Sequence, residues 1–306
     1  NNPQLFKHLS RKFRIAYYPT TKEKKMEFQT LNNGIKIPVL GFGVWQIFDQ
    51  KECQKAVEDA LSVGYRLIDT ASLYRNEEAV GRAIKASGIP REDIFLTSKA
   101  WISQLGYEDT KLALKETLRK LDTDYLDLYL IHQPFGDLHG AWRAMIELKH
   151  EELIRAIGVS NFSTGRLADF ALQTPVIPAV NQIELHPYKQ HKLIQKADKE
   201  FGTLTQAWAP FHRGEDGIFQ DPTLTAIAEK HGKTVAQVIL RWQTQQGILT
   251  IPKSTHIERM KENFNSFDFH LDQADLDAIS KLDRYPNAYG PDESVERIKH
   301  LLKYSV

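Results

Sequence analysis

Apolar and polar positions alternate in blocks along this chain from Met26 onward. Short apolar runs rich in β-branched residues are each followed by a turn and then by a stretch whose apolar residues recur at helical spacing. Near-continuous apolar runs are typical of parallel strands that helices cover on both faces. The pattern predicts eight strands, at 39–45, 65–71, 94–100, 126–134, 154–162, 179–185, 203–210 and 248–254.

The stretches between the strands predict amphipathic helices. In residues 76–87 the apolar positions form one stripe, Asn76 is a candidate amino-terminal cap, and Gly88 is placed to end the helix. Further helices are predicted at 110–121, 137–152, 189–200, 223–231 and 234–246.

The repetition of strand and helix favours a closed (β/α)8 TIM barrel over an open sheet. A dinucleotide-binding Rossmann sheet is the alternative, and it requires G-x-G-x-x-G after the first strand. Gly41 and Gly43 begin that pattern, but position 46 is Gln, so the pattern fails. Residues 27–38 predict a β-hairpin that turns at Asn33-Gly34, and we expect it to cap the bottom of the barrel.

Charge separates residues 1–25 from the rest of the chain. This segment has a charge of +6 and the remainder of −5, since the formal net charge of the 306 residues is +1. We expect 26–306 to form a single barrel domain and 1–25 to lie outside it, as a non-native remnant, a transit segment or a native extension. An acidic body lacks the basic field that nucleic-acid binding requires, so no nucleic-acid partner is expected.

Hydropathy and cysteine content bear on membrane association and on the cellular compartment of the protein. No apolar run approaches the roughly 18–20 residues of a membrane span, so no membrane partner is expected. Cys53 is the only cysteine, which fits a reducing compartment. We therefore expect the protein in the cytoplasm, or in an organelle if residues 1–25 are a native transit segment. We also expect it to be a monomer.

Polar or aromatic residues stand at the carboxyl ends of the eight predicted strands. In a barrel these ends converge on one face, where active sites lie. In chain order they are Trp45, Asp69, Lys99, His132, Ser160-Asn161, Gln182, Trp208 and Lys253-Ser254.

Four side chains, Asp69, Tyr74, Lys99 and His132, together predict a proton donor. A phenol has a pKa of about 10, and a neighbouring ammonium lowers it by favouring the phenolate. A carboxylate holds the ammonium in place, and a neutral imidazole can orient a substrate oxygen. Each residue alone has a structural explanation, such as an ion pair for Asp69 with Lys99, but the four residues together favour a catalytic role.

Several blocks of the sequence resemble the aldo-keto reductase superfamily, from about Met26 to Asp283. They are LIDTASLYRNEEAVGRAI, LTSKAW, YLDLYLIH, IRAIGVSNF, VNQIELHP and IPKSTHIERMKEN. QAWAPF and the compact loops resemble the microbial branch with diketogluconate reductases and prostaglandin F synthases. The resemblance implies a (β/α)8 barrel that reduces aldehydes and ketones reversibly with NAD(P)H. It also implies that Tyr74 is the proton donor, that Lys99 and Asp69 assist it, and that His132 orients the carbonyl.

The resemblance also assigns a nicotinamide site. Ser160, Asn161 and Gln182 would hold the carboxamide, for which their donors and acceptors are suited. Trp208 stands at the position of the aromatic residue that stacks on the nicotinamide ring; core packing is its alternative role.

At the adenosine end, Lys253 and Ser254 follow a strand. The spacing from Thr255 to Glu258 predicts a capping box that opens a helix, whose amino end attracts anions. Arg259 is placed to bind a 2′-phosphate bidentately, which favours NADPH over NADH. The resemblance gives adenine contacts to Glu262 and Asn263. A solvated basic helix face is the alternative.

The sequence indicates less about the carbonyl substrate than about the cofactor or the proton donor. The resemblance places Trp45 and Trp101, with His132, around the substrate, but Gln133 follows His132 where many members have Trp. The tail after Asp283 matches no substrate loop that can be assigned. Two other functions stay open: a nucleotide-binding regulatory protein with little turnover, and a metal-dependent hydrolase. The second is disfavoured because Lys99 would oppose a cation, so no catalytic metal is expected.

Overall fold

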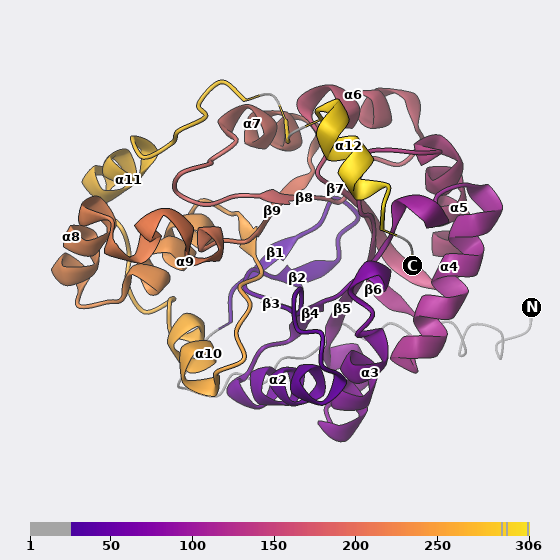
Figure 1. Ribbon diagram of the computed structural model, residues 1–306, viewed down its shortest axis with the longest axis horizontal. Helices are drawn as coiled ribbons and strands as arrows, with labels where there is room; N and C mark the ends of the chain where they lie inside the picture. Colours follow the sequence, from indigo (N-terminus) through magenta and orange to yellow (C-terminus); the bar gives the residue numbers. More distant parts are fainter. Residues whose placement is uncertain (1–25, 289, 292, 305) are drawn as a thin grey trace, which may run out of the picture.

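Parallel strands form a closed barrel at the centre of the molecule (Figure 1). The computed structural model describes residues 26–288, 290–291, 293–304 and 306. Within these residues one sheet has the order β10-β9-β8-β7-β6-β5-β4-β3, and each strand pairs in parallel with its neighbour in sequence. The strands are β3 (Phe42–Gly43), β4 (Leu67–Asp69), β5 (Phe95–Ala100), β6 (Leu126–Ile131), β7 (Ile154–Ser160), β8 (Val180–Glu184), β9 (Leu204–Trp208) and β10 (Leu249–Thr250).

Backbone hydrogen bonds between the first and last strands close the barrel. Leu40 forms a parallel bridge with Thr250. The amide of Gly41 donates to the carbonyl of Thr250 at 2.8 Å, and the amide of Thr250 donates to the carbonyl of Val39 at 2.8 Å. The predicted (β/α)8 barrel is therefore confirmed.

Helices surround the strands (Figure 1). They are α2 (Gln50–Val63), α3 (Glu77–Ala86), α4 (Tyr107–Leu121), α5 (Leu138–His150), α6 (Thr164–Gln173), α7 (Lys192–Phe201), α8 (Pro222–His231), α9 (Val235–Gln245), α10 (Ile257–Phe264), α11 (Gln273–Ser280) and α12 (Val295–Leu301), with 3-10 turns η1 (Ser72–Tyr74), η2 (Arg91–Asp93), η3 (Ile102–Gln104) and η4 (His212–Gln220). In the part of the chain that the structure describes, no helix is long and apolar enough to span a bilayer.

Four of these helices, α2, α6, α11 and α12, were not predicted from the pattern. The buried face of α2 is mostly small residues, and α6 buries only Leu167 and Phe170, so neither shows a strong apolar stripe. The first and last strands are shorter than predicted. Pro252 has no amide hydrogen to extend the ladder of β10, although its carbonyl accepts from the amide of Gly43 at 3.2 Å.

The predicted hairpin is confirmed and closes the bottom of the barrel. β1 (Phe28–Thr30) pairs antiparallel with β2 (Lys36–Pro38). Its loop has three residues, 32–34, rather than a two-residue turn, because Leu31 and Ile35 still share a hydrogen bond and Gly34 takes a left-handed φ of 87°. The Asn33 side chain donates to the carbonyl of Arg155 at 3.1 Å, near the start of β7.

The alternation of side chains along each strand determines which residues reach the barrel interior. Leu67, Leu128 and Leu130 belong to the interior apolar cluster, whereas their neighbours Ile68 and Tyr129 pack in the cluster beneath the outer helices. Continuing this alternation places Asp69, Lys99 and His132 on the interior side at the carboxyl ends of β4, β5 and β6.

Gly41 and Gly43 begin the incomplete dinucleotide pattern, and packing explains both. A Cβ atom on Gly41 would lie 2.2 Å from Leu67 Cδ2, and one on Gly43 would lie 3.0 Å from the carbonyl oxygen of Ile251. The first strand therefore has glycines because neighbouring strands approach it closely, and no phosphate-binding role is needed to explain them.

Residues 1–25 lie outside the described residues, so their assignment outside the barrel stays a prediction. Because the described barrel is closed and its bottom is capped without them, deleting 1–25 is expected to leave melting temperature and turnover nearly unchanged. Thermal unfolding and steady-state kinetics of the shortened and full chains would check this. A large loss of either would show that the segment packs on the barrel.

Candidate active site

A buried ion pair stands at the centre of the strand ends. Lys99 Nζ on β5 lies 2.5 Å from Asp69 Oδ1 on β4, and both side chains are almost fully buried. The ammonium also donates to the carbonyl oxygen of Thr70 at 2.9 Å and to the Tyr74 hydroxyl at 3.3 Å. Lys99 therefore joins the carboxylate to the phenol, as the sequence analysis expected.

The short turn η1 places Tyr74 beside Lys99. Asn76 fixes this segment: its amide oxygen accepts from the Thr70 hydroxyl at 2.8 Å, and its amide nitrogen donates to the carbonyls of Val44 and Ile47. Asn76 precedes α3 but makes no side-chain cap, which corrects the predicted capping role. Its side chain instead ties the Tyr74 turn to the segment that follows β3.

Aromatic rings enclose the phenol. The ring centroid of Tyr74 lies 4.7 Å from that of Trp45 and 5.6 Å from that of His132. Trp101 contacts His132 edge to face at 5.0 Å. Trp45 is 40% exposed, but Trp101 is only 1% exposed. Its indole Nε1 donates to the backbone carbonyl of Tyr304 at 2.9 Å, so the C-terminal tail covers the tryptophan predicted to line the substrate site.

Burial and charge set the protonation of this group. Burial raises the pKa of Tyr74, and Lys99 opposes that rise without reversing it. The expected influence of Lys99 is present, but the predicted net lowering is not found, because desolvation of the phenolate is larger. Burial would lower the pKa of Lys99, yet Asp69 and Tyr74 together raise it. Burial and Lys99 hold the pKa of His132 well below its usual value. At neutral pH the phenol therefore keeps its proton and the imidazole is neutral.

Amides and hydroxyls from β7, β8 and β9 form a connected polar cluster beside the ion pair. Ser160 Oγ donates to the carbonyl of Gln182 at 2.9 Å, and Asn161 Nδ2 donates to the carbonyl of His132 at 3.1 Å. Trp208 Nε1 donates to Asn161 Oδ1 at 3.0 Å. The structure thus brings together all four residues assigned to the nicotinamide.

Gln182 links this cluster to the ion pair. Its Nε2 donates to Asp69 Oδ2 at 2.8 Å and to Gln206 Oε1 at 2.8 Å. Gln206 is fully buried and was not singled out from the sequence. It stands two residues before Trp208 on β9, and strand alternation was the signal that could have identified it as facing the interior.

The predicted adenosine site lies at α10, apart from the ion pair. Lys253 and Arg259 are exposed, and neither has an ion pair among the described residues. Asn263 is buried, whereas Glu262 accepts a hydrogen bond from the Thr234 hydroxyl at 2.7 Å. Ser254 is buried and accepts from the amide of His256 at 3.1 Å.

The capping box predicted at the start of α10 is absent from the structure. The helix begins at Ile257, His256 precedes it without a side-chain cap, and Glu258 pairs with Lys261 at 2.8 Å. Ser254 Oγ instead accepts from the amide of His256, just before the helix begins. Lys253 and Arg259 are exposed near this amino end, and an anion site there stays a prediction.

A cavity of about 230 Å³ adjoins the polar cluster. Asn161 and Trp208 form part of its wall, and Pro291, Glu293 and Arg297 of the C-terminal tail form another part. The tail that the sequence analysis could not assign therefore lies beside the strand ends. A larger groove of about 870 Å³ lies between α3 and α4 and contains none of the predicted site residues.

Comparison with known proteins identifies the family. The Aldo/keto reductase family profile matches residues 39–215 and 218–284. The chain therefore belongs to the aldo/keto reductase family, which confirms the resemblance described above.

Individual relatives match over nearly their full length. The glyoxal reductase of Bacillus subtilis is 45% identical over 255 residues, covering 83% of this chain and 92% of that protein. An aldo/keto reductase structure from Brucella melitensis is 50% identical with a TM-score of 0.81, covering 85% of this chain and 100% of that one. A Bombyx mori aldo-keto reductase in complex with NADP is 34% identical with a TM-score of 0.81, covering 85% and 93%. The Bacillus relative agrees with the expected microbial branch.

Proposed function

We propose that this aldo/keto reductase reduces aldehydes and ketones to alcohols with NADPH and that Tyr74 is the general acid. The observation that carries the proposal is the contact of one buried ammonium, on Lys99, with both the Asp69 carboxylate and the Tyr74 hydroxyl. The chain is an NADP-dependent carbonyl oxidoreductase by its family, and a related silkworm structure is a complex with NADP.

The polar residues present fit a nicotinamide cofactor. Ser160, Asn161 and Gln182 offer hydroxyl and amide groups of the kind that pair with a carboxamide, and they adjoin a cavity that Trp208 partly lines. Trp208 is partly exposed, so one face is available for stacking. At the other end, the exposed Arg259 and Lys253 provide the positive charge for a 2′-phosphate.

Each residue of the central group has a distinct role in the proposed reaction. Bound NADPH supplies the hydride that reaches the carbonyl carbon. The neutral imidazole of His132 hydrogen-bonds the carbonyl oxygen and orients it toward the phenol. Tyr74 holds a proton at neutral pH and donates it from its hydroxyl as negative charge develops on that oxygen. Lys99 stabilises the resulting phenolate, and Asp69 holds the ammonium in position.

The substrate proposal is a small reactive carbonyl compound. The name of the Bacillus relative indicates a dicarbonyl substrate for that protein, and we extend the class to this chain. NADPH oxidation with aldehydes, diketones, methylglyoxal, quinones and sugar-derived ketones tests it. Turnover of any of these compounds supports a reductase. NADPH binding with no turnover of any of these compounds would favour the regulatory alternative.

Replacing Arg259 with alanine is expected to weaken NADPH binding much more than NADH binding. Loss of a charge-assisted contact to the 2′-phosphate costs about 1.5–3 kcal/mol, or roughly one to two decades in affinity. Titration of both cofactors by tryptophan fluorescence measures the effect. Lys261→Ala is the matched control, because it removes one positive charge from the same helix at a residue already paired with Glu258. Equal weakening of both cofactors would refute the 2′-phosphate role.

A further inference from the structure

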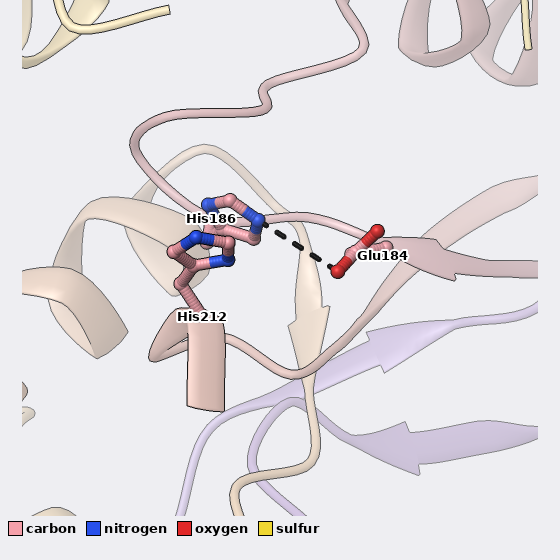
Figure 2. Close-up of side chains that lie close together, drawn as sticks. All are labelled: Glu184, His186 and His212. Atoms are coloured by element: carbon pink, nitrogen blue, oxygen red, sulfur yellow. Dashed lines mark ion pairs between the residues drawn. The ribbon is translucent and has the colours of Figure 1, made fainter. Parts of the chain in front are cut away.

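Two stacked histidines and a glutamate converge where β8 and β9 end (Figure 2). Glu184 is the last residue of β8, His186 follows it, and His212 begins η4. The imidazole centroids of His186 and His212 lie 4.2 Å apart, and His186 Nε2 lies 3.9 Å from Glu184 Oε1. One ligand atom from each residue lies within 4.8 Å of the other two.

Three buried imidazole nitrogens at this place lack hydrogen-bond partners in the part of the chain described. His186 is only 1% exposed, and neither of its ring nitrogens makes a hydrogen bond there. Nδ1 of His212 is also buried and without such a partner, whereas its Nε2 lies 3.3 Å from Asp216 Oδ2. A neutral imidazole has one donor and one acceptor, and nearly all buried polar atoms in proteins are satisfied. These three nitrogens are therefore open to a ligand, either ordered water or a cation.

The chemistry of the three side chains favours a cation over water. Two imidazoles and a carboxylate form a ligand set that suits zinc, with a fourth position left for water. Tetrahedral zinc with bonds of about 2.1 Å places its ligand atoms roughly 3.4 Å apart. Here the ligand atoms lie within 4.8 Å of one another, and the two rings are stacked with 29° between their planes. Because an imidazole lone pair lies in the plane of its ring, at least one ring must rotate before both point at one ion.

Neighbouring charges leave one glutamate oxygen available. Lys189 Nζ binds Glu184 Oε2 at 2.8 Å, which orients the carboxylate as partners of metal ligands commonly do. Glu184 Oε1 lies 3.9 Å from both His186 Nε2 and a guanidinium nitrogen of Arg213, so a bound cation would have to displace Arg213. Arg213 also lies 5.6 Å from the Trp208 ring, so it has a second contact if a cation displaces it.

We propose that Glu184, His186 and His212 bind a divalent transition-metal ion of the zinc class, separate from the proton-transfer group. The ion would join η4 to the end of β8. His212 has a left-handed φ of 48°, a backbone conformation that few non-glycine residues adopt, and in it the His212 ring lies over that of His186. Glu184 is the register partner of Trp208, and both line the cavity of about 230 Å³. The site therefore shares a wall with the proposed cofactor cavity but uses different side chains from Lys99 and Tyr74.

Zinc titration of the full-length protein by calorimetry, without cofactor or substrate, tests the site. We expect one zinc ion to bind, and cobalt to give visible absorption typical of nitrogen and oxygen coordination. His186→Gln and His212→Gln should each weaken zinc binding by more than about tenfold, the lower range for loss of a metal-ligand partner. His139→Gln is the matched control, because it alters a surface histidine paired with Asp169 and should leave binding unchanged.

Two further measurements separate a metal site from trapped water. Arg213→Gln removes a positive charge near Glu184 and should tighten zinc binding at least severalfold, since like charges repel at this distance. Zinc should also raise the melting temperature of the wild type but not of His212→Gln, whose half-buried site tolerates glutamine better than that of His186. Absence of stoichiometric binding, or binding equally strong in both histidine variants, would overturn the proposal whatever the enzyme's activity.

Discussion

Tyr74→Phe is expected to reduce the turnover of carbonyl substrates by at least about 10²–10⁴-fold, the usual contribution of general acid–base catalysis. Phenylalanine keeps the ring contacts with Trp45 and His132 but removes the hydroxyl that Lys99 contacts. NADPH affinity should change little, because the proposed cofactor contacts come from other strands. Single-turnover kinetics, with cofactor binding followed by tryptophan quenching, would measure both quantities.

Tyr107→Phe provides the control for a lost hydroxyl. Tyr107 begins α4, and its hydroxyl donates to the Glu147 carboxylate on α5, so the change alters a contact between two outer helices and none of the proposed catalytic residues. Turnover of this variant should stay near the wild-type rate. If Tyr74→Phe also retained wild-type turnover while binding NADPH normally, Tyr74 would not be the acid and the whole catalytic assignment would fail.

Lys99→Met is expected to damage both activity and stability. Removing the ammonium leaves the Asp69 carboxylate buried without its counter-charge, which typically costs about 3–5 kcal/mol in the free energy of unfolding. The variant should also lose turnover to a degree similar to Tyr74→Phe, since the charge that stabilises the phenolate is gone. Urea unfolding and single-turnover kinetics measure the two effects separately.

Double variants distinguish the two roles of Lys99. Combining Lys99→Met with Asp69→Asn removes both charges, so much of the lost stability should return while turnover stays low. Combining it with Tyr74→Phe should slow turnover little beyond either single change, because residues that act as a unit are not additive. Strictly multiplicative losses in that second pair would contradict a shared role for Lys99 and Tyr74.

Strand alternation made the centre of the site predictable from the sequence. Asp69, Lys99 and His132 end three successive apolar runs, and a barrel must bring those ends together. The structure accordingly places Lys99 against Asp69. The sign of the net pKa shift of Tyr74 was not predictable in the same way, because it depends on how far the phenol is desolvated, and burial depends on the packing of rings such as Trp45.

Contacts made by backbone atoms or between distant segments escaped the sequence analysis. Trp101 is covered by a carbonyl of Tyr304, and a backbone carbonyl has no residue-type signature. The hydrogen bond from Gln182 to Asp69 depends on the barrel curvature that brings β8 opposite β4. The His186 and His212 pair was missed because a loop conformation, not a sequence spacing, brings the rings together.

The hydrogen bonds of Thr250 with Val39 and Gly41 have a consequence for how the barrel assembles. Among the described strands, all the remaining pairings join neighbours in sequence, so the sheet can grow in the order of synthesis. Closure of the barrel must wait for the last strand. Such a long-range contact slows folding, because the chain loses conformational entropy in closing the long loop before the strand pairing contributes any stabilisation. Until β10 docks, both edges of the sheet expose unpaired amides and carbonyls, so a chain truncated before Leu249 would be prone to edge-to-edge aggregation.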